Sequence, residues 1–279
     1  MAKIAFLLLC HTDPAGIARQ ARSLAAAGDA VAIHLDARAP AADHAHLRAA
    51  TRDAPDIVLV RRPVRCDWGH WSLVRATLIT IRTALDAVPD ATHLYLVSGA
   101  CRPITSAAHL HAALDAHDID RIESVDAFTS NWVLPPAARD RLAYRHPVGR
   151  RRAPRLFDVL LSAQKTLGLD RRPPADIDVM IGAQWWCLRR DTARKILAFA
   201  KSRRDVARYF STTWIPDETF FQTLVRHLIP REEIAGPPTL HIFGATGRPV
   251  TFHDDHHDLL LGQDRFFARK ISPDATDLH

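Results

Sequence analysis

The sequence predicts an α/β protein in which a mostly parallel, Rossmann-type sheet is flanked by helices within a single domain. Short apolar runs alternate with segments of helical spacing over the first hundred residues, and the chain opens in the order strand, helix, strand. At 279 residues with 47% hydrophobic content, the chain is long enough to bury one large core.

The first elements have the signals of a βαβ unit. Residues 3–9 form a continuous apolar run, as in a strand that is buried on both faces. Asp13-Pro14 begins a helix that extends to residue 27, and Gly28 ends it. Residues 30–35 are again apolar, so a second parallel strand is expected there.

The same alternation continues to residue 98. We expect a helix at 41–51, a strand at 57–60, a helix at 72–87 and a strand at 93–98. Polar residues follow three of these strands, namely His11, Asp36 and Ser98-Gly99. Parallel sheets bind ligands beyond their carboxyl ends, so residues 1–105 are predicted to form a nucleotide-binding half.

The remainder, residues 106–279, is predicted to form the second half of the domain. Residues 118–174 show no clear helical or strand spacing of apolar residues, because proline, arginine and aromatic residues occur throughout the segment. We expect a strand at 179–188, helices at 191–200 and 217–228, a strand at 240–243, and a short helix at 254–261.

The formal charge of +6 comes almost wholly from arginine and favours anionic partners. Nucleic acid is not an expected partner, because the dense basic run is confined to Arg150–Arg152 with Arg155 nearby. The same run suggests peripheral association with an anionic membrane.

The cysteines and the start of the chain predict a cytoplasmic protein, and the basic run predicts that it lies peripherally at the inner face of the membrane. The four cysteines are far apart in the sequence and form no metal-binding pair, as expected of buried thiols in a reducing compartment. The apolar run at the start is far shorter than the ~20 residues that span a bilayer.

The segment from Trp214 to Thr223 contains the candidate catalytic group. Motifs of dehydrogenases, P-loop enzymes, serine hydrolases and zincins are absent from the sequence. Asp217 and Glu218 are expected in the first turn of a helix, where the dipole favours carboxylates. Two interpretations fit these carboxylates. They form a favourable helix start, or one of them is a general base next to Trp214.

Seven short pieces of the chain, in order, resemble the core-2/I-branching enzyme family of glycosyltransferases, which includes β-1,6-N-acetylglucosaminyltransferases and peptide O-xylosyltransferases. The likeness covers most of the chain. The pieces are AFLLLCHTDP, VAIHLDARAP, WGHWSLVRATL, HLYLVSGACRPI, IGAQWWCLRRDTARKIL, PDETFFQT and DRFFARKIS.

This resemblance implies a GT-A-like fold and inverting transfer of a sugar, GlcNAc or xylose, from a UDP-sugar to a hydroxyl of a glycan or lipid-linked acceptor. It also implies no metal and no cofactor other than the donor substrate. By the same resemblance Glu218 is the base, Lys270 and Arg248 bind the diphosphate, and His11 and Asp36 contact the nucleoside.

The resemblance further implies that residues 106–279 form an acceptor half whose C-terminal segment folds over the diphosphate. It places Ser98-Gly99 near the donor sugar. It places Gln184, Trp185, Trp214 and Asp217 toward the acceptor side. The sequence departs from many relatives at Cys101, where they have aspartate, so a contact to the donor sugar is expected to differ.

Two alternatives remain open. A non-catalytic module that binds nucleotide sugars or glycans would keep the fold without the chemistry. A metal-dependent transferase would use a D-x-D motif, for which Asp118-Ile119-Asp120 and Asp176-Ile177-Asp178 are the candidates. The cluster at 253–258 has metal-binding residue types, but a capped acidic helix start is the expected structure.

Overall fold

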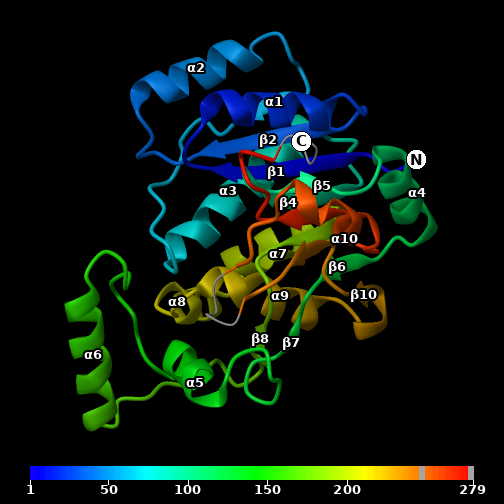
Figure 1. Cartoon of the computed structure of the whole chain (residues 1–279). Helices are drawn as coiled ribbons and strands as arrows, with labels where there is room; N and C mark the ends of the chain where they lie inside the picture. Colours follow the sequence, from blue (N-terminus) through cyan, green and yellow to red (C-terminus); the bar gives the residue numbers. More distant parts are fainter. Residues whose placement is uncertain (245–248, 276–279) are drawn as a thin grey trace.

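A seven-stranded sheet with the order β10-β6-β9-β4-β1-β2-β3 forms the centre of the computed structural model, which describes residues 1–244 and 249–275 (Figure 1). Within the described residues, β9 is the single strand of this sheet that runs antiparallel to its neighbours. The predicted mixed α/β class with a mostly parallel sheet is therefore confirmed. The strands are β1 (Ile4–Cys10), β2 (Ala30–Leu35), β3 (Ile57–Leu59), β4 (His93–Ser98), β6 (Asp120–Ile122), β9 (Trp186–Arg189) and β10 (Ile234–Ala235).

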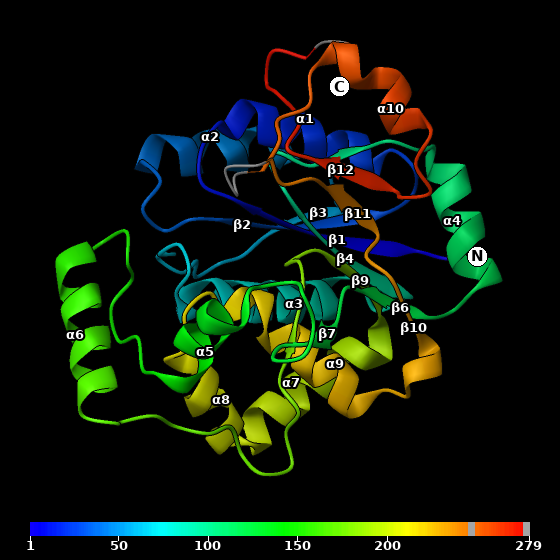
Figure 2. The same cartoon turned by 60° about the horizontal axis from the view of Figure 1, so that its bottom comes forward.

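Helices cover both faces of the sheet, which explains why the inner strands are apolar throughout. Figure 2 shows α1, α2 and α10 on one side of the sheet, and α3, α7, α8 and α9 on the other. Their bounds are α1 (Pro14–Ala25), α2 (Ala41–Thr51), α3 (Trp71–Ala87), α4 (Ala107–Ala116), α7 (Arg190–Ser202), α8 (Arg204–Ser211), α9 (Phe220–Leu228) and α10 (His257–Leu261). No helix in the described ranges is long and apolar enough to cross a bilayer.

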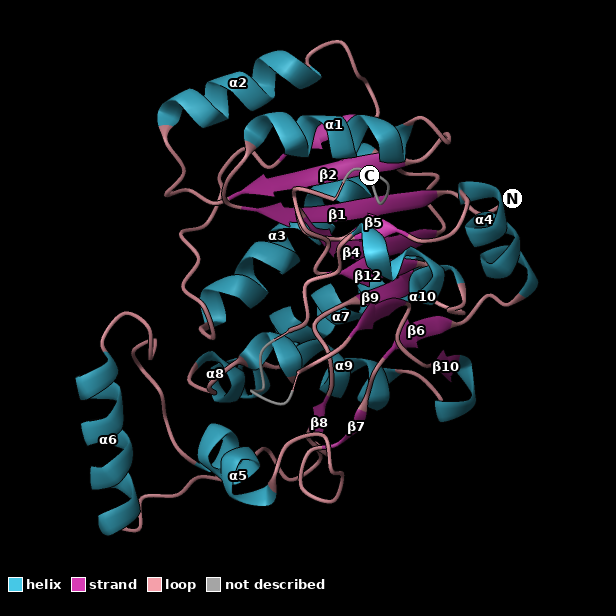
Figure 3. Cartoon of the chain, viewed as in Figure 1, coloured by secondary structure: helices cyan, strands magenta, loops and turns pink. Residues whose placement is uncertain are grey.

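The segment 118–174 contains more regular structure than its sequence predicted. It includes β6, the short strand β7 (Val125–Asp126) and the helices α5 (Pro135–Ala143) and α6 (Pro154–Thr166). Helix α6 stands at the periphery of the molecule (Figure 3) and buries a single described side chain, that of Phe157. The helix was not predicted because proline and arginine residues interrupt the sequence around it.

The predicted strand at 179–188 is wrong in one respect, because the structure divides it into two strands of different sheets. Strand β8 (Met180–Ile181) pairs with β7, whereas β9 pairs with β4 and β6. Residues 182–185 lie between them, and Gly182 is their first residue. A Cβ atom on Gly182 would lie 2.0 Å from the carbonyl oxygen of Glu123, so the backbones approach closely only because this residue is glycine.

The C-terminal segment returns to the centre of the molecule. Strand β12 (Phe267–Arg269) lies between β11 (Thr239–His241) and β5 (Arg102–Pro103) in a small sheet. The Phe267 ring packs on Tyr95 of β4 with a centroid distance of 4.8 Å. The Ile271 amide also donates to the Ala100 carbonyl at 3.0 Å, which places residue 270 close to the loop after β4.

The acidic cluster at 253–258 has the predicted role in helix capping. His253 caps a 3-10 turn, Asp254–His256, and exchanges side-chain hydrogen bonds with His256 in a capping box. Helix α10 follows directly.

The first D-x-D candidate allows a stability prediction. The buried Asp120 carboxylate accepts hydrogen bonds from the Arg189 side chain and amide and from the Thr192 hydroxyl, whereas the Asp118 side chain is 73% exposed. We expect Asp120→Ala to lower the free energy of unfolding by roughly 3–5 kcal/mol, because the Arg189 charge would lose its buried partner. Urea unfolding of this variant against Asp118→Ala, for which a loss below about 1 kcal/mol is expected, measures the difference. Equal losses in the two variants would refute a structural role for Asp120.

Candidate active site

The polar residues that follow the parallel strands meet at one edge of the sheet. Leu9 of β1 is in register with Ser98 of β4, and the Asp36 amide donates to the Cys10 carbonyl at 2.9 Å. The structure therefore brings His11, Asp36 and Ser98 to the carboxyl edge, as the strand order predicted. His11 is exposed there, whereas Asp36 is buried.

Glu218 lies in a separate 3-10 turn and not in the first turn of a longer helix. The turn comprises Pro216–Glu218, and α9 begins two residues after it, so the prediction of one helix over 217–228 is wrong. Ile215, just before the turn, has φ 55° and ψ 57°, a left-handed conformation that is costly for a β-branched residue. Local strain of this kind concentrates at functional sites.

The backbone around Glu218 is attached to the segment before β9. The Gly182 amide donates to the Glu218 carbonyl at 3.0 Å, and the Gln222 side-chain amide donates to the Ala183 carbonyl at 2.7 Å. Because β9 is antiparallel to β4, the residues before it lie toward the carboxyl edge of the parallel strands. Glu218 is thereby joined to the edge that carries Ser98.

Arg141 of α5 holds the Glu218 carboxylate. Its Nη1 atom lies 2.8 Å from Glu218 Oε2, and the two side chains are only 15% and 23% exposed. Burial raises the pKa of Glu218, while the Arg141 charge and hydrogen bond act in the opposite direction and lower it. Arg141 thus fixes the orientation of the Glu218 carboxylate, and burial and the Arg141 charge act on its pKa in opposite directions. A general base needs both a fixed position and an adjusted pKa.

Asp217 faces the protein interior. Its side chain is buried, and its Oδ1 atom has no hydrogen-bond partner among the described residues. Burial, followed by the Glu218 charge, raises the pKa of Asp217 to about 7. The two neighbouring carboxyl groups therefore differ in environment, and Glu218 is the more accessible of them.

Glu123 is a second carboxylate near Glu218 that the sequence analysis missed. It follows β6, accepts a hydrogen bond from the Ala183 amide at 2.8 Å, and raises the pKa of Glu218 through its charge. No motif marks it. The sequence gives no clear signal for Glu123, because β6 (Asp120–Ile122) has only three residues and two of them are charged.

Arg269 is the second functional candidate that the sequence analysis missed. Its guanidinium lies 4.2 Å from the centroid of the Trp185 ring, and its side chain hydrogen-bonds Cys101. Burial lowers the pKa of Arg269, and the Glu218 charge raises it. The sequence indicates Arg269 only through its position directly before Lys270.

Cys101 and Trp185 therefore lie next to a cation. The Cys101 thiol is also 3.3 Å from the Ser98 hydroxyl. Trp185 was expected toward the acceptor, but its ring is buried against Arg269 at the C-terminal segment. Gln184 is half-buried beside it.

Lys270 follows β12 at the same edge and is exposed. Desolvation lowers the pKa of Lys270, and the positive charges of Arg269 and Arg151 lower it further. Several cations thus converge near the loop after β4. Arg248, the other predicted diphosphate ligand, lies outside the described residues.

Asp36 has protein partners at the end of β2. Its oxygens accept hydrogen bonds from the Cys66 amide at 3.1 Å and from the Arg38 amide at 2.8 Å. Arg38 also contacts Asp67 at 2.9 Å. This arrangement fixes the loop that follows β3 against the predicted nucleoside site.

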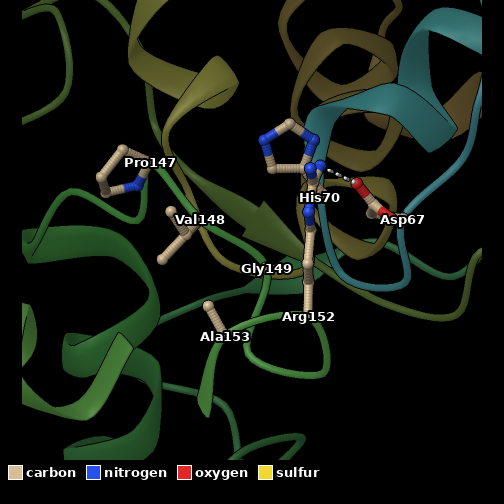
Figure 4. Close-up of a pocket in the computed structure, with 7 residues that line it drawn as sticks. All are labelled: Asp67, His70, Pro147, Val148, Gly149, Arg152 and Ala153. Carbon is tan, nitrogen blue, oxygen red and sulfur yellow. Dashed lines mark ion pairs between the residues drawn. The ribbon is translucent and has the colours of Figure 1, made fainter. Parts of the chain in front are cut away.

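Trp214 connects this loop to Glu218. The Ile215 amide donates to the Gly69 carbonyl at 2.9 Å, and the Arg141 guanidinium lies 5.6 Å from the centroid of the Trp214 ring. A cavity of about 360 Å³ lies next to the same loop, between Asp67 and His70 on one side and Pro147 to Gly149 on the other (Figure 4). It is lined by Asp67, His70, Pro147, Val148, Gly149, Arg152 and Ala153.

Both D-x-D tripeptides contain an aspartate that forms an ion pair with an arginine. Asp120 is bonded to Arg189, and Asp176 forms an ion pair with Arg203 at 2.6 Å. Residues 98–102, at the end of β4 and in the loop after it, include no carboxylate.

Residues 4–241 match the family model described as "Branch: Core-2/I-Branching enzyme". The chain belongs to the core-2/I-branching enzyme family. It is 22% identical over 261 residues to the beta-1,3-galactosyl-O-glycosyl-glycoprotein beta-1,6-N-acetylglucosaminyltransferase of bovine herpesvirus 4 (strain DN-599), a match that covers 93% of this chain and 55% of the relative. The chain thus spans about half the length of that relative.

Proposed function

We propose that this member of the core-2/I-branching family is an inverting glycosyltransferase that transfers GlcNAc or xylose from a UDP-sugar to a hydroxyl of a glycan or lipid-linked acceptor. The observation that carries the proposal is the Glu218 carboxylate, held by Arg141 at the carboxyl edge of the sheet near Arg269 and Lys270.

In the proposed reaction Glu218 accepts the proton of the acceptor hydroxyl. The acceptor oxygen forms a bond to the anomeric carbon while the bond from that carbon to the diphosphate breaks, and UDP leaves from the opposite face. Fixed cations stabilise the negative charge that develops on the leaving group. We propose that Arg269 and Lys270 supply this charge and that the reaction needs no metal ion.

The proposal extends to the location of the enzyme. A cytoplasmic protein that binds the membrane surface peripherally would meet lipid-linked acceptors there. Exposed apolar residues of α6, among them Leu156 and Val159, support such contact.

The test is UDP release from a panel of UDP-sugars with added glycan acceptors, with and without EDTA. We expect turnover with UDP-GlcNAc or UDP-xylose that EDTA leaves unchanged. Binding of UDP-sugars with no turnover under any condition would favour the non-catalytic module. Loss of turnover in EDTA that Mn²⁺ restores would show a metal-dependent transferase.

A further inference from the structure

Helix α6 has a stripe of apolar residues that faces solvent. Its members recur at spacings of three or four residues and therefore lie on one side of the helix, namely Leu156, Val159, Ala163 and Leu167. All of them are exposed. A contiguous group of exposed apolar side chains on a water-soluble surface marks a place where another surface binds. The stripe therefore indicates an interaction surface.

Another side of α6 attaches the helix to the protein next to the candidate active site. The ring of Phe157, its buried residue, lies 5.2 Å from the ring of Trp214 between centroids. Trp214 lies two residues before the turn that carries Glu218. The rest of α6 stands at the edge of the molecule, away from the central sheet (Figures 1 and 2). The helix is thus fixed near Glu218 at its start, and the apolar stripe points away from the protein.

The chain around α6 carries the positive charge of the protein. Residues 145–172 contain eight Lys and Arg residues, and their only acidic residues are Asp158 and Asp170. The net charge of this segment is therefore +6, the same as that of the whole chain, and the remaining residues are neutral on balance. A charge concentrated in this way attracts an anionic surface.

The exposed cations nearest to the stripe are Arg155 and Arg172. The dense run Arg150–Arg152 precedes α6 and folds back onto the body of the protein, where Arg152 forms an ion pair with Asp67 at 3.6 Å. Arg155 lies in the first turn of α6, and Arg172 follows the helix. Exposed cations next to an apolar stripe are typical of a helix that lies in the interface of an anionic membrane.

A second copy of the chain fits this surface poorly. In a symmetric dimer the same patch of both subunits meets, so two segments of charge +6 would face each other and repel. A bilayer with anionic headgroups neutralises the basic residues and takes up the apolar side chains at the same time. Charge complementarity therefore favours a membrane as the occupant.

We propose that α6 docks the protein on an anionic bilayer, with Leu156, Val159 and Leu167 inserted below the headgroups and with Arg155 and Arg172 on the lipid phosphates. We call these five residues the α6 surface. The inference deepens the peripheral location proposed above by naming the surface and the lipid chemistry. It rests on that location and not on the chemistry of sugar transfer.

Sedimentation of the full chain with vesicles tests the apolar part of the α6 surface. The vesicles consist of phosphatidylcholine alone or of an equal mixture with phosphatidylglycerol, and the wild type is expected to bind the mixed vesicles only. Leu156→Ser/Val159→Ser is matched by Leu259→Ser/Leu261→Ser on α10, because both pairs of residues are 47% and 62% exposed. The α6 pair should weaken binding about tenfold or more, since two apolar side chains lose their burial in lipid, and the α10 pair should stay within about twofold of the wild type.

A second pair of variants tests the basic part of the α6 surface. Arg155→Ala/Arg172→Ala should weaken binding to the mixed vesicles by about tenfold, and high salt should weaken binding of the wild type in the same direction. The matched control is Arg48→Ala/Arg52→Ala, which removes two exposed arginines at α2. Its binding should stay within about twofold of the wild type.

Equal vesicle binding by the α6 and α10 serine variants would overturn the apolar contact. Equal binding of the wild type to both kinds of vesicle would overturn the choice of an anionic lipid. A wild-type dimer in ultracentrifugation without vesicles, dissociated by Leu156→Ser/Val159→Ser, would assign the stripe to a second copy instead. Failure of the wild type to bind any vesicle would overturn the α6 surface alone, because UDP release with soluble acceptors tests the transfer reaction separately.

Discussion

Replacement of Glu218 by glutamine is expected to lower kcat for sugar transfer by about 10²–10⁴-fold, the usual contribution of a positioned general base. Glutamine preserves the size of the side chain and a hydrogen-bond acceptor for Arg141, but it cannot accept the proton of the acceptor hydroxyl. The affinity for UDP should change little, because the Arg269 and Lys270 side chains are retained. Steady-state kinetics and calorimetric titration with UDP measure the two quantities separately.

The matched control for this change is Glu232→Gln, which removes a carboxylate from an exposed position. Its kcat should equal that of the wild type. Wild-type turnover by Glu218→Gln would exclude Glu218 as the base and direct attention to Glu123, the neighbouring carboxylate at the end of β6.

The part of the fold that could be predicted from sequence is the part where local patterns and burial agree. Strands β2 and β4 and helix α2 have the predicted bounds, because their apolar runs or helical spacing end at clear turn signals. The segment before β9 was predicted less well. Whether residues 180–188 form one strand or two depends on the close approach of Gly182 to Glu123, which is a tertiary contact.

The candidate site likewise contains residues that could be predicted from the sequence and residues that could not. His11, Asp36 and Ser98 could be placed together because strand order alone decides which strand ends are neighbours. Arg141, by contrast, lies on a helix with little hydrophobic period and reaches Glu218 from 77 residues away in the sequence. No local sequence pattern indicates the pairing of Arg141 with Glu218, because Arg141 is one of many arginines in a basic chain.

Replacement of Arg141 by methionine is expected to lower kcat/KM at pH 7 by about tenfold or more and to change its pH dependence. Methionine keeps an apolar stem of similar length but leaves the Glu218 carboxylate without its cation. The loss of a partner for a buried charge disfavours the ionised form and also frees the side chain to leave its productive position.

The sign of the pH effect follows from the role of the base. Glu218 is active as a carboxylate, so the rate falls as the pH drops below its pKa. Arg141 lowers that pKa, and its removal therefore raises it and moves the acidic limb of the profile of kcat/KM against pH to higher pH. Part of the lost rate should return as the assay pH is raised, and Arg141→Lys should lie between the wild type and Arg141→Met. Arg139→Met removes an exposed arginine from the same helix and should leave both the rate and the profile unchanged. A reduced rate in Arg141→Met with an unshifted acidic limb would mean that Arg141 supports the fold around Trp214 and does not set the ionisation of Glu218.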